Sequence, residues 1–318
     1  SPKKEKLTLS LRTIIISMKI NLFDTNNPAC NLWFNGWQPH HCKDVEYIRP
    51  PLLEFDGPTV FTDELMIHPV VDQVTSKYKF GLFVEPKSIK PAAYEVLAKD
   101  PSVADKFDAI FTHDERLLSI SSKFRLFPFL AGSYILEEDI KIHDKSKSLS
   151  IVASEKVWAE GHRLRHEVIQ RYGTRMDCYG PFYTNLYEDY KNESTETLKG
   201  TYLKVTGNLF RAFKDYRYAV VIHSIRCKNY FDEKLLNCFF TGTIPIVWSP
   251  TNVGEFFDID GCLEFSNLDD LEGVLDKLSV EDYDSRREAI KNNFEMAHKY
   301  ISFDKYLKEQ IEAYIEEK

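Results

Sequence analysis

Short apolar runs alternate with a helical pattern along the first part of the chain. A run of about four to eight apolar residues between polar ones is typical of a buried strand, and apolar positions three and four apart indicate a helix. The expected strands cover 19–23, 59–61, 80–85, 107–113 and 124–129, with a helix at 91–99. This alternation predicts an α/β unit.

The pattern starts again after a polar, lysine-rich segment at 140–148. The expected elements are then strands at 149–154, 218–224 and 243–248, helices near 160–172 and 230–241, and amphipathic helices at 269–279 and 303–318. The boundary therefore divides the chain into two α/β domains, 1–145 and 146–318. The second carries a C-terminal helical tail, whose last helix crosses back toward the first domain.

Composition narrows the classes of protein that fit. The 318 residues are 43% hydrophobic and 28% charged, as in a folded globular protein. The net charge of −8 and the lack of a long basic run argue against nucleic acid as a partner. The six cysteines form no Cys-x-x-Cys pair, so we expect reduced thiols and a cytoplasmic location. The apolar stretch at 7–23 is interrupted by Arg12 and Lys19, so we expect an arm and first strand there, with no membrane span.

The first candidate chemistry is the pair Glu233-Lys234. We expect the helix there to begin at Tyr230 and to end near Gly242, which places the pair in the first helical turn. Backbone N–H groups at a helix start favour an anion, and Lys234 adds a positive charge. The strand at 218–224 leads into this helix, and ligands of open α/β sheets bind beyond the carboxyl ends of strands. On local chemistry alone, a solvated ion pair remains the alternative.

A longer motif surrounds this pair. Tyr230-x-x-Glu233-Lys234-Leu235, followed by Thr-Gly-Thr-Ile-Pro-Ile-Val-Trp at 241–248, resembles the donor-binding signature of the α-1,3/4-fucosyltransferases, glycosyltransferase family 10. The similarity continues upstream through 216–224 and more loosely through 150–180. The resemblance implies a GT-B type fold of two facing Rossmann-like domains, with the acceptor on the first and the nucleotide-sugar donor on the second.

The resemblance also implies roles for individual residues. It places Glu233 on the ribose or fucose of the donor, Lys234 and Arg163 on its diphosphate, and Tyr230 against the donor. Fixed cations suit this task because the leaving diphosphate gains charge as the glycosidic bond breaks. Arg165 and Arg171 are nearby candidates for the role of Arg163.

One position departs from the family. The family commonly has Glu-Asn where this chain has His223-Ser224, within an otherwise matching strand. We still expect both residues to bind the donor. Because Ser224 lacks the amide of Asn, the identity of the donor stays open.

Inverting sugar transfer needs a base that removes the proton of the acceptor hydroxyl. Glu85 follows the apolar stretch "FGLFV", where apolar surroundings at the edge of a cleft raise the pKa of a carboxyl group. Its segment resembles, more weakly, the part of the family that carries the proposed basic glutamate. Asp63, Glu64 and the cluster 113–115 also follow predicted strands and are competing candidates for the base.

Three segments contain residues of the types that bind metal ions. Two Asp-x-Asp triplets, at 258–260 and 282–284, are candidates for a divalent ion, but they fall in the later turn and helix region. In the His-His-Cys segment at 40–42, adjacent side chains of a strand point to opposite faces. We expect this segment to be a surface loop whose neighbours Trp33 or Trp37 touch the acceptor, and we expect no metal site.

The chain has none of the glycine-rich phosphate or dinucleotide motifs, and no Gly-x-Ser-x-Gly. We therefore expect an inverting glycosyltransferase that moves a sugar, fucose by default, from a nucleotide diphosphate to a hydroxyl of a glycan, without a metal or other cofactor. One alternative is a relative that uses another donor, such as a UDP-linked pentose or deoxysugar. A second is a carbohydrate-binding protein without turnover.

Overall fold

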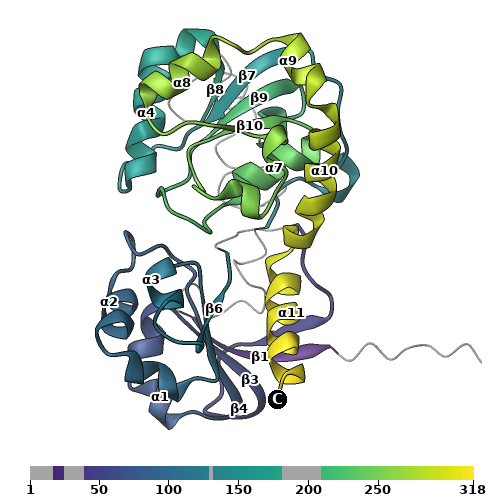
Figure 1. Ribbon diagram of the computed structural model, residues 1–318. Helices are drawn as coiled ribbons and strands as arrows, with labels where there is room; N and C mark the ends of the chain where they lie inside the picture. The colour runs from purple at the N-terminus through teal and green to yellow at the C-terminus, as the bar shows by residue number, and fades with distance from the viewer. Residues whose placement is uncertain (1–16, 25–38, 129–131, 181–208) are drawn as a thin grey trace, which may run out of the picture.

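The computed structural model describes residues 17–24, 39–128, 132–180 and 209–318, which form two lobes around one sheet each (Figure 1). The predicted arm before β1, together with Trp33 and Trp37, lies outside these residues.

The first sheet has the strand order β2-β1-β3-β4-β5-β6, and all of its pairs are parallel. Its strands are β1 (Met18–Phe23), β2 (Val45–Ile48), β3 (Glu54–Thr62), β4 (Thr75–Leu82), β5 (Ala109–Thr112) and β6 (Phe124–Leu126). Three short helices accompany them, α1 (Val70–Gln73), α2 (Ala92–Lys99) and α3 (Glu115–Leu118). The first β/α region of the prediction is thus confirmed. The strand β2, which has a mixed polar and apolar sequence, was not predicted.

Alternate residues of these strands pack into two different cores, as the strand period of two requires. Phe61 and Ile110 pack on one face with Tyr94 and Leu97 of α2. The opposite face carries Val60, Phe80 and Phe111, which pack with α11 (Phe303–Glu316). The last helix therefore returns to cover the first sheet.

The second sheet has the order β11-β10-β9-β7-β8 and is also parallel in every pair. Its strands are β7 (Lys147–Val152), β8 (Asp177–Tyr179), β9 (Tyr216–Val221), β10 (Ile244–Val247) and β11 (Leu263–Glu264). Its helices are α4 (Glu160–Tyr172), α7 (Glu233–Thr241), α8 (Leu268–Leu275), α9 (Val280–Ser285) and α10 (Arg287–Ala297). Val168 of α4 and Leu271 of α8 pack on one face, and Leu235 and Phe239 of α7 pack on the other.

The helix α7 begins three residues later than predicted. Asp232 is its N-cap, and the Asp232 side chain accepts a hydrogen bond from the Lys234 N–H. Tyr230 lies in the preceding loop. At the other end, Gly242 has φ +74°, a left-handed conformation that closes the helix as predicted.

The two lobes share one continuous core. Helix α11 descends from the upper lobe to the lower sheet in Figure 1, and Tyr306 packs its ring 5.0 Å from that of Phe127. At the far end of the helix, Arg125 pairs with Glu317. Because the same core cluster contains the α7 side chains, the packing that forms each lobe also holds the lobes together.

The segment between the sheets is anchored by a half-buried lysine. The Lys145 ammonium lies within hydrogen-bond distance of the carbonyl oxygens of Phe213, Lys214 and Thr241 and of the Thr243 hydroxyl. Burial lowers the pKa of Lys145 to about 7. These contacts of Lys145 connect the segment between the sheets to the end of α7.

The predicted α/β fold class is confirmed: two Rossmann-like domains, each built on a parallel sheet with helices, and a C-terminal helical tail. Of the described helices, none combines the length and the apolar character needed to cross a membrane. The five cysteines in the described ranges are all free thiols.

Candidate active site

A cavity of about 570 Å³ opens between the two lobes. Its walls include residues that follow β4, β7 and β9, so the carboxyl ends of strands from both sheets meet there. The lining residues are Glu85, Ile89, Tyr134, Val152, Ser154, Lys156, Trp158, His162, Arg165, Leu209, Ser224, Tyr230, Asp232, Glu233 and Lys234. Of the seven predicted site residues, Glu85, Ser224, Tyr230, Glu233 and Lys234 are brought together here.

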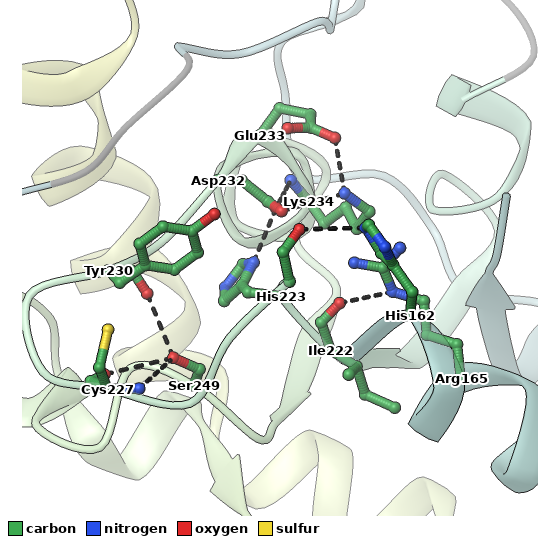
Figure 2. Close-up of polar contacts among 11 residues, drawn as sticks. His162, Arg165, Ile222, His223, Cys227, Tyr230, Asp232, Glu233, Lys234 and Ser249 are labelled. Atoms are coloured by element: carbon green, nitrogen blue, oxygen red, sulfur yellow. Dashed lines mark hydrogen bonds and ion pairs between the residues drawn. The ribbon is translucent and has the colours of Figure 1, made fainter. Parts of the chain in front are cut away.

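Charges are concentrated at the start of α7. The Lys234 ammonium lies 2.7 Å from a Glu233 carboxylate oxygen and 3.1 Å from one of Asp232 (Figure 2). These two carboxylates raise the pKa of Lys234 although burial opposes them. Lys234 is therefore held in place and largely neutralised by its own helix turn.

His223 contacts the start of α7 and is not among the residues that line the cavity. Its ring is fully buried, and its Nδ1 lies 2.8 Å from Asp232 Oδ1 (Figure 2). Burial alone would raise the pKa of Asp232, but His223 and Lys234 together hold it well below its usual range. His223, predicted to bind the donor, thus contacts the N-cap of α7.

The arginine that faces the cavity is Arg165. Arg163 is exposed and donates hydrogen bonds to the carbonyl oxygens of Val157 and Trp158. Residues two apart on a helix are separated by about 200°, so the two side chains leave α4 on opposite sides. Arg163 is therefore not among the residues that line the cavity. Arg165, the neighbouring candidate in the sequence, does line it.

Arg165 is 4% exposed and keeps most of its hydrogen-bonding capacity. Its Nε donates to the Ile222 carbonyl oxygen at 2.7 Å (Figure 2). No other hydrogen bond of its guanidinium is found within the described part of the chain. Since a guanidinium carries five N–H donors, its terminal NH₂ groups are available to a ligand.

His162 and Ser224 form a second polar contact on the wall. His162 Nε2 lies 3.2 Å from the Ser224 hydroxyl. Burial, and then the charge of Arg165, lower the pKa of His162 to about 4. The ring is therefore neutral at pH 7 and adds no positive charge to the cavity.

Glu85 faces the cavity from the other lobe. Burial raises its pKa, and the negative charge of Asp63 raises it further. Asp63 is itself 1% exposed and accepts hydrogen bonds from the N–H groups of Val84 and Glu85. Its second oxygen lies 3.2 Å from Lys90 Nζ. Asp63, which the sequence also offered as a base, thus positions the loop that carries Glu85.

Glu64, the cluster 113–115 and Arg171 lie outside this cavity. Glu64 is not among its lining residues, and 113–115 line a neighbouring cavity of about 530 Å³. Burial lowers the pKa of His113 to about 3. Arg171 pairs with Glu272 at 3.2 Å on the surface of its lobe.

In each Asp-x-Asp triplet, the first carboxylate has partners within the protein. Asp258 accepts from the Asp260 N–H and from Asn292, and Asp282 accepts from Arg286 and from the Tyr218 hydroxyl. Over the described ranges, no three His, Cys, Asp or Glu side chains gather as metal ligands would.

The His-His-Cys segment lies in a half-exposed loop, as predicted, and its two histidines contact later parts of the chain. His40 Nε2 lies 2.6 Å from the Ile135 carbonyl oxygen, and His41 Nδ1 lies 3.1 Å from Asp304 of α11. Both histidines therefore join the N-terminal lobe to later segments of the chain.

Gly161 allows α4 to approach the end of β9. Its N–H donates to the Ser224 carbonyl oxygen at 3.0 Å, and a Cβ atom there would lie 1.7 Å from the His223 carbonyl oxygen. Sequence patterning did not point to this glycine, although a glycine at a helix start beside a strand end signals such a close approach.

No family model matches this sequence, and a search of curated proteins found no significant match. The solved structures that are similar in fold include three of α1,3-fucosyltransferase. A crystal structure of α1,3-fucosyltransferase is 13% identical with a TM-score of 0.47, covering 94% of this chain and 89% of that chain. The crystal structure of α1,3-fucosyltransferase with GDP is 14% identical with a TM-score of 0.48, covering 99% of this chain and 92% of that chain. The structure with GDP-fucose is 13% identical with a TM-score of 0.37, covering 88% of this chain and 81% of that chain. At identities and TM-scores this low, the likeness assigns no function, and the chemistry of the cleft residues has to do so.

We predict that Gly161→Ala destabilises the protein by about 1–3 kcal/mol, because the added methyl group forces α4 away from the His223 carbonyl. The matched control is Gly273→Ala, since a Cβ atom at Gly273 in α8 meets nothing within 4 Å. There the change to alanine stabilises by at most about 1 kcal/mol. Urea unfolding measures both, and equal stability of the Gly161 variant and the wild type would contradict the close approach.

Proposed function

We propose that this protein is an inverting glycosyltransferase that transfers a sugar from a nucleotide diphosphate donor to a hydroxyl group of a glycan. The donor lies against the second lobe, 146–318, and the acceptor lies between the lobes with its reacting hydroxyl at the first, 1–145. The cleft residues support this assignment, since a cation with free donors and a carboxylate of raised pKa face one cavity from opposite lobes.

The proposal rests chiefly on the buried guanidinium of Arg165 and its unused hydrogen-bond donors. A buried guanidinium with unused N–H groups is costly unless a ligand supplies acceptors for them. A diphosphate offers several oxygens in a geometry that suits an arginine. As the bond to the sugar breaks, the leaving diphosphate gains negative charge, which Arg165 stabilises more than it stabilises the bound donor.

Lys234 and the start of α7 complete this anion site. Lys234 already contacts two carboxylates, so we assign it a smaller share of the phosphate binding than Arg165. When Lys234 turns toward the phosphate, Glu233 is free to accept a hydrogen bond from a hydroxyl group of the ribose or of the donor sugar. Side chains supply the positive charge in this proposal, which requires no metal ion.

Glu85 serves as the base. Its carboxylate takes the proton of the acceptor hydroxyl while that oxygen attacks the anomeric carbon from the face opposite the diphosphate. The new glycosidic bond forms as the old one breaks, and the diphosphate leaves with the electron pair. One displacement inverts the configuration. Asp63 serves this step by holding the loop at Val84 and Glu85.

Fucose carried by GDP is the default donor, on the strength of the motif at 230–248. A UDP-linked pentose or deoxysugar is the second candidate, and Ser224 favours it, because a hydroxyl bonded to His162 lines the cavity where the family has an amide. A carbohydrate-binding protein without turnover is the competing class. Release of nucleotide diphosphate in the presence of a glycan would exclude it.

We predict that Arg165→Met weakens the binding of GDP or UDP by about 10- to 100-fold, because a charge-assisted hydrogen bond contributes about 1.5–3 kcal/mol. The control is Arg163→Met, two residues away on the exposed side of α4, which should change the affinity less than about twofold. Titration calorimetry measures the affinity, and a melting curve checks that each variant folds. Weakened binding in the Arg163 variant alone would overturn the assignment of Arg165.

We predict that Glu85→Gln lowers turnover by about 10²- to 10⁴-fold, the usual contribution of a positioned base, and leaves nucleotide affinity unchanged. Because the base works as a carboxylate and its pKa is raised, wild-type turnover should fall as the pH drops through that raised pKa. This acid limb should disappear in the variant. A folded variant that keeps more than about a third of the activity would show that another group is the base.

A further inference from the structure

Trp158 is the most exposed large hydrophobic side chain among the described residues, with 71% of its surface open. It lies in the loop between β7 and α4, and its side chain lines the cavity between the lobes. Exposing a tryptophan costs free energy in water, so an exposed indole at the mouth of a polar cleft indicates a binding surface.

The loop that carries Trp158 is held by several contacts. Arg163 donates to the carbonyl oxygens of Val157 and Trp158, at 3.1 and 3.4 Å. The Lys156 ammonium lies 5.4 Å from the centre of the indole, and the His162 ring packs edge-on at 6.3 Å. These contacts give Arg163 a role that the sequence did not suggest. They also leave most of the indole uncovered.

A residue beside the indole interacts with the first lobe. The charge of Lys156 acts on Glu85 across the cavity and works against the effect of burial on the pKa of that carboxyl group. Ile89, which follows Glu85 in the same loop, is 38% exposed and lines the cavity too. Apolar surface from both lobes therefore lines the same cavity as the base, and Arg165 and Lys234 line it as cations.

We propose that Trp158 is the platform for the acceptor sugar, with the apolar C–H face of a pyranose ring stacked on the indole and one hydroxyl directed at Glu85. This inference rests on the proposed function and names its acceptor class, a pyranoside. A pyranose ring suits the site because it has an apolar face for the indole and hydroxyl groups at its edge for the carboxylate. The diphosphate of the donor is assigned to Arg165, which lines the same cavity.

The test uses Trp158→Ala and Trp158→Phe, with Val157→Ala as the matched control, because Val157 is 54% exposed and does not line the cavity. The probes are the methyl β-pyranosides of glucose, galactose and N-acetylglucosamine, with GDP and UDP as nucleotides. Saturation-transfer NMR reports pyranoside binding, and calorimetry reports nucleotide binding.

We expect Trp158→Ala to weaken the best pyranoside by about tenfold, as loss of an aromatic anchor does. Trp158→Phe should recover part of that loss, Val157→Ala should match the wild type, and nucleotide affinity should stay within about twofold in all three. Pyranoside binding that is absent from the wild type, or equal in the alanine variant, would overturn the inference. Weaker nucleotide binding with unchanged pyranoside binding would assign the indole to the nucleobase and overturn it as well. Failure of the wild type to bind either nucleotide would instead overturn the proposed function.

Discussion

The whole site depends on the parallel pairing of both sheets. In every described strand pair the chains run in the same direction, so all carboxyl ends of a sheet emerge at one edge. The residues after β4, β7 and β9 line one cavity, which means that the two edges face each other. Helix α11 and the shared core fix this arrangement, because the last helix of the chain packs on the first sheet. A change that loosens α11 would thus act on the cleft from a distance.

The electrostatics of the cleft follow from one buried carboxylate. Asp232 caps α7, contacts His223 and Lys234, and attracts Arg165 through space. A buried charge of this kind needs several partners, and removing one of them is more harmful than its net contribution suggests. Asp232 and Glu233 largely balance Lys234, whereas the guanidinium of Arg165 keeps unused donors. The pair of His223 and Asp232 thus determines how Lys234 is presented.

Hydrophobic patterning was enough to predict the two sheets, most of their strands and the helix at 160–172, because each of these elements buries a regular apolar face. It placed the start of α7 three residues too early, since Phe231 continues an apolar pattern that is not helical and the helix starts only after its N-cap, Asp232. Hydrophobic patterning could not decide which of Arg163 and Arg165 faces the cavity. Both lie on α4, and the choice between them depends on which side of the helix meets β9, a tertiary contact that Gly161 makes possible. The exposure of Trp158 was equally hidden, because an isolated tryptophan in a sequence is usually a core residue.

A crystal structure with bound GDP or UDP tests the central claim most directly. The account predicts that diphosphate oxygens lie within hydrogen-bond distance of the terminal nitrogens of Arg165 and near the start of α7, with the open side of the sugar position toward Glu85. A nucleotide bound instead in the neighbouring cavity lined by His113, Arg116 and Lys228 would contradict it.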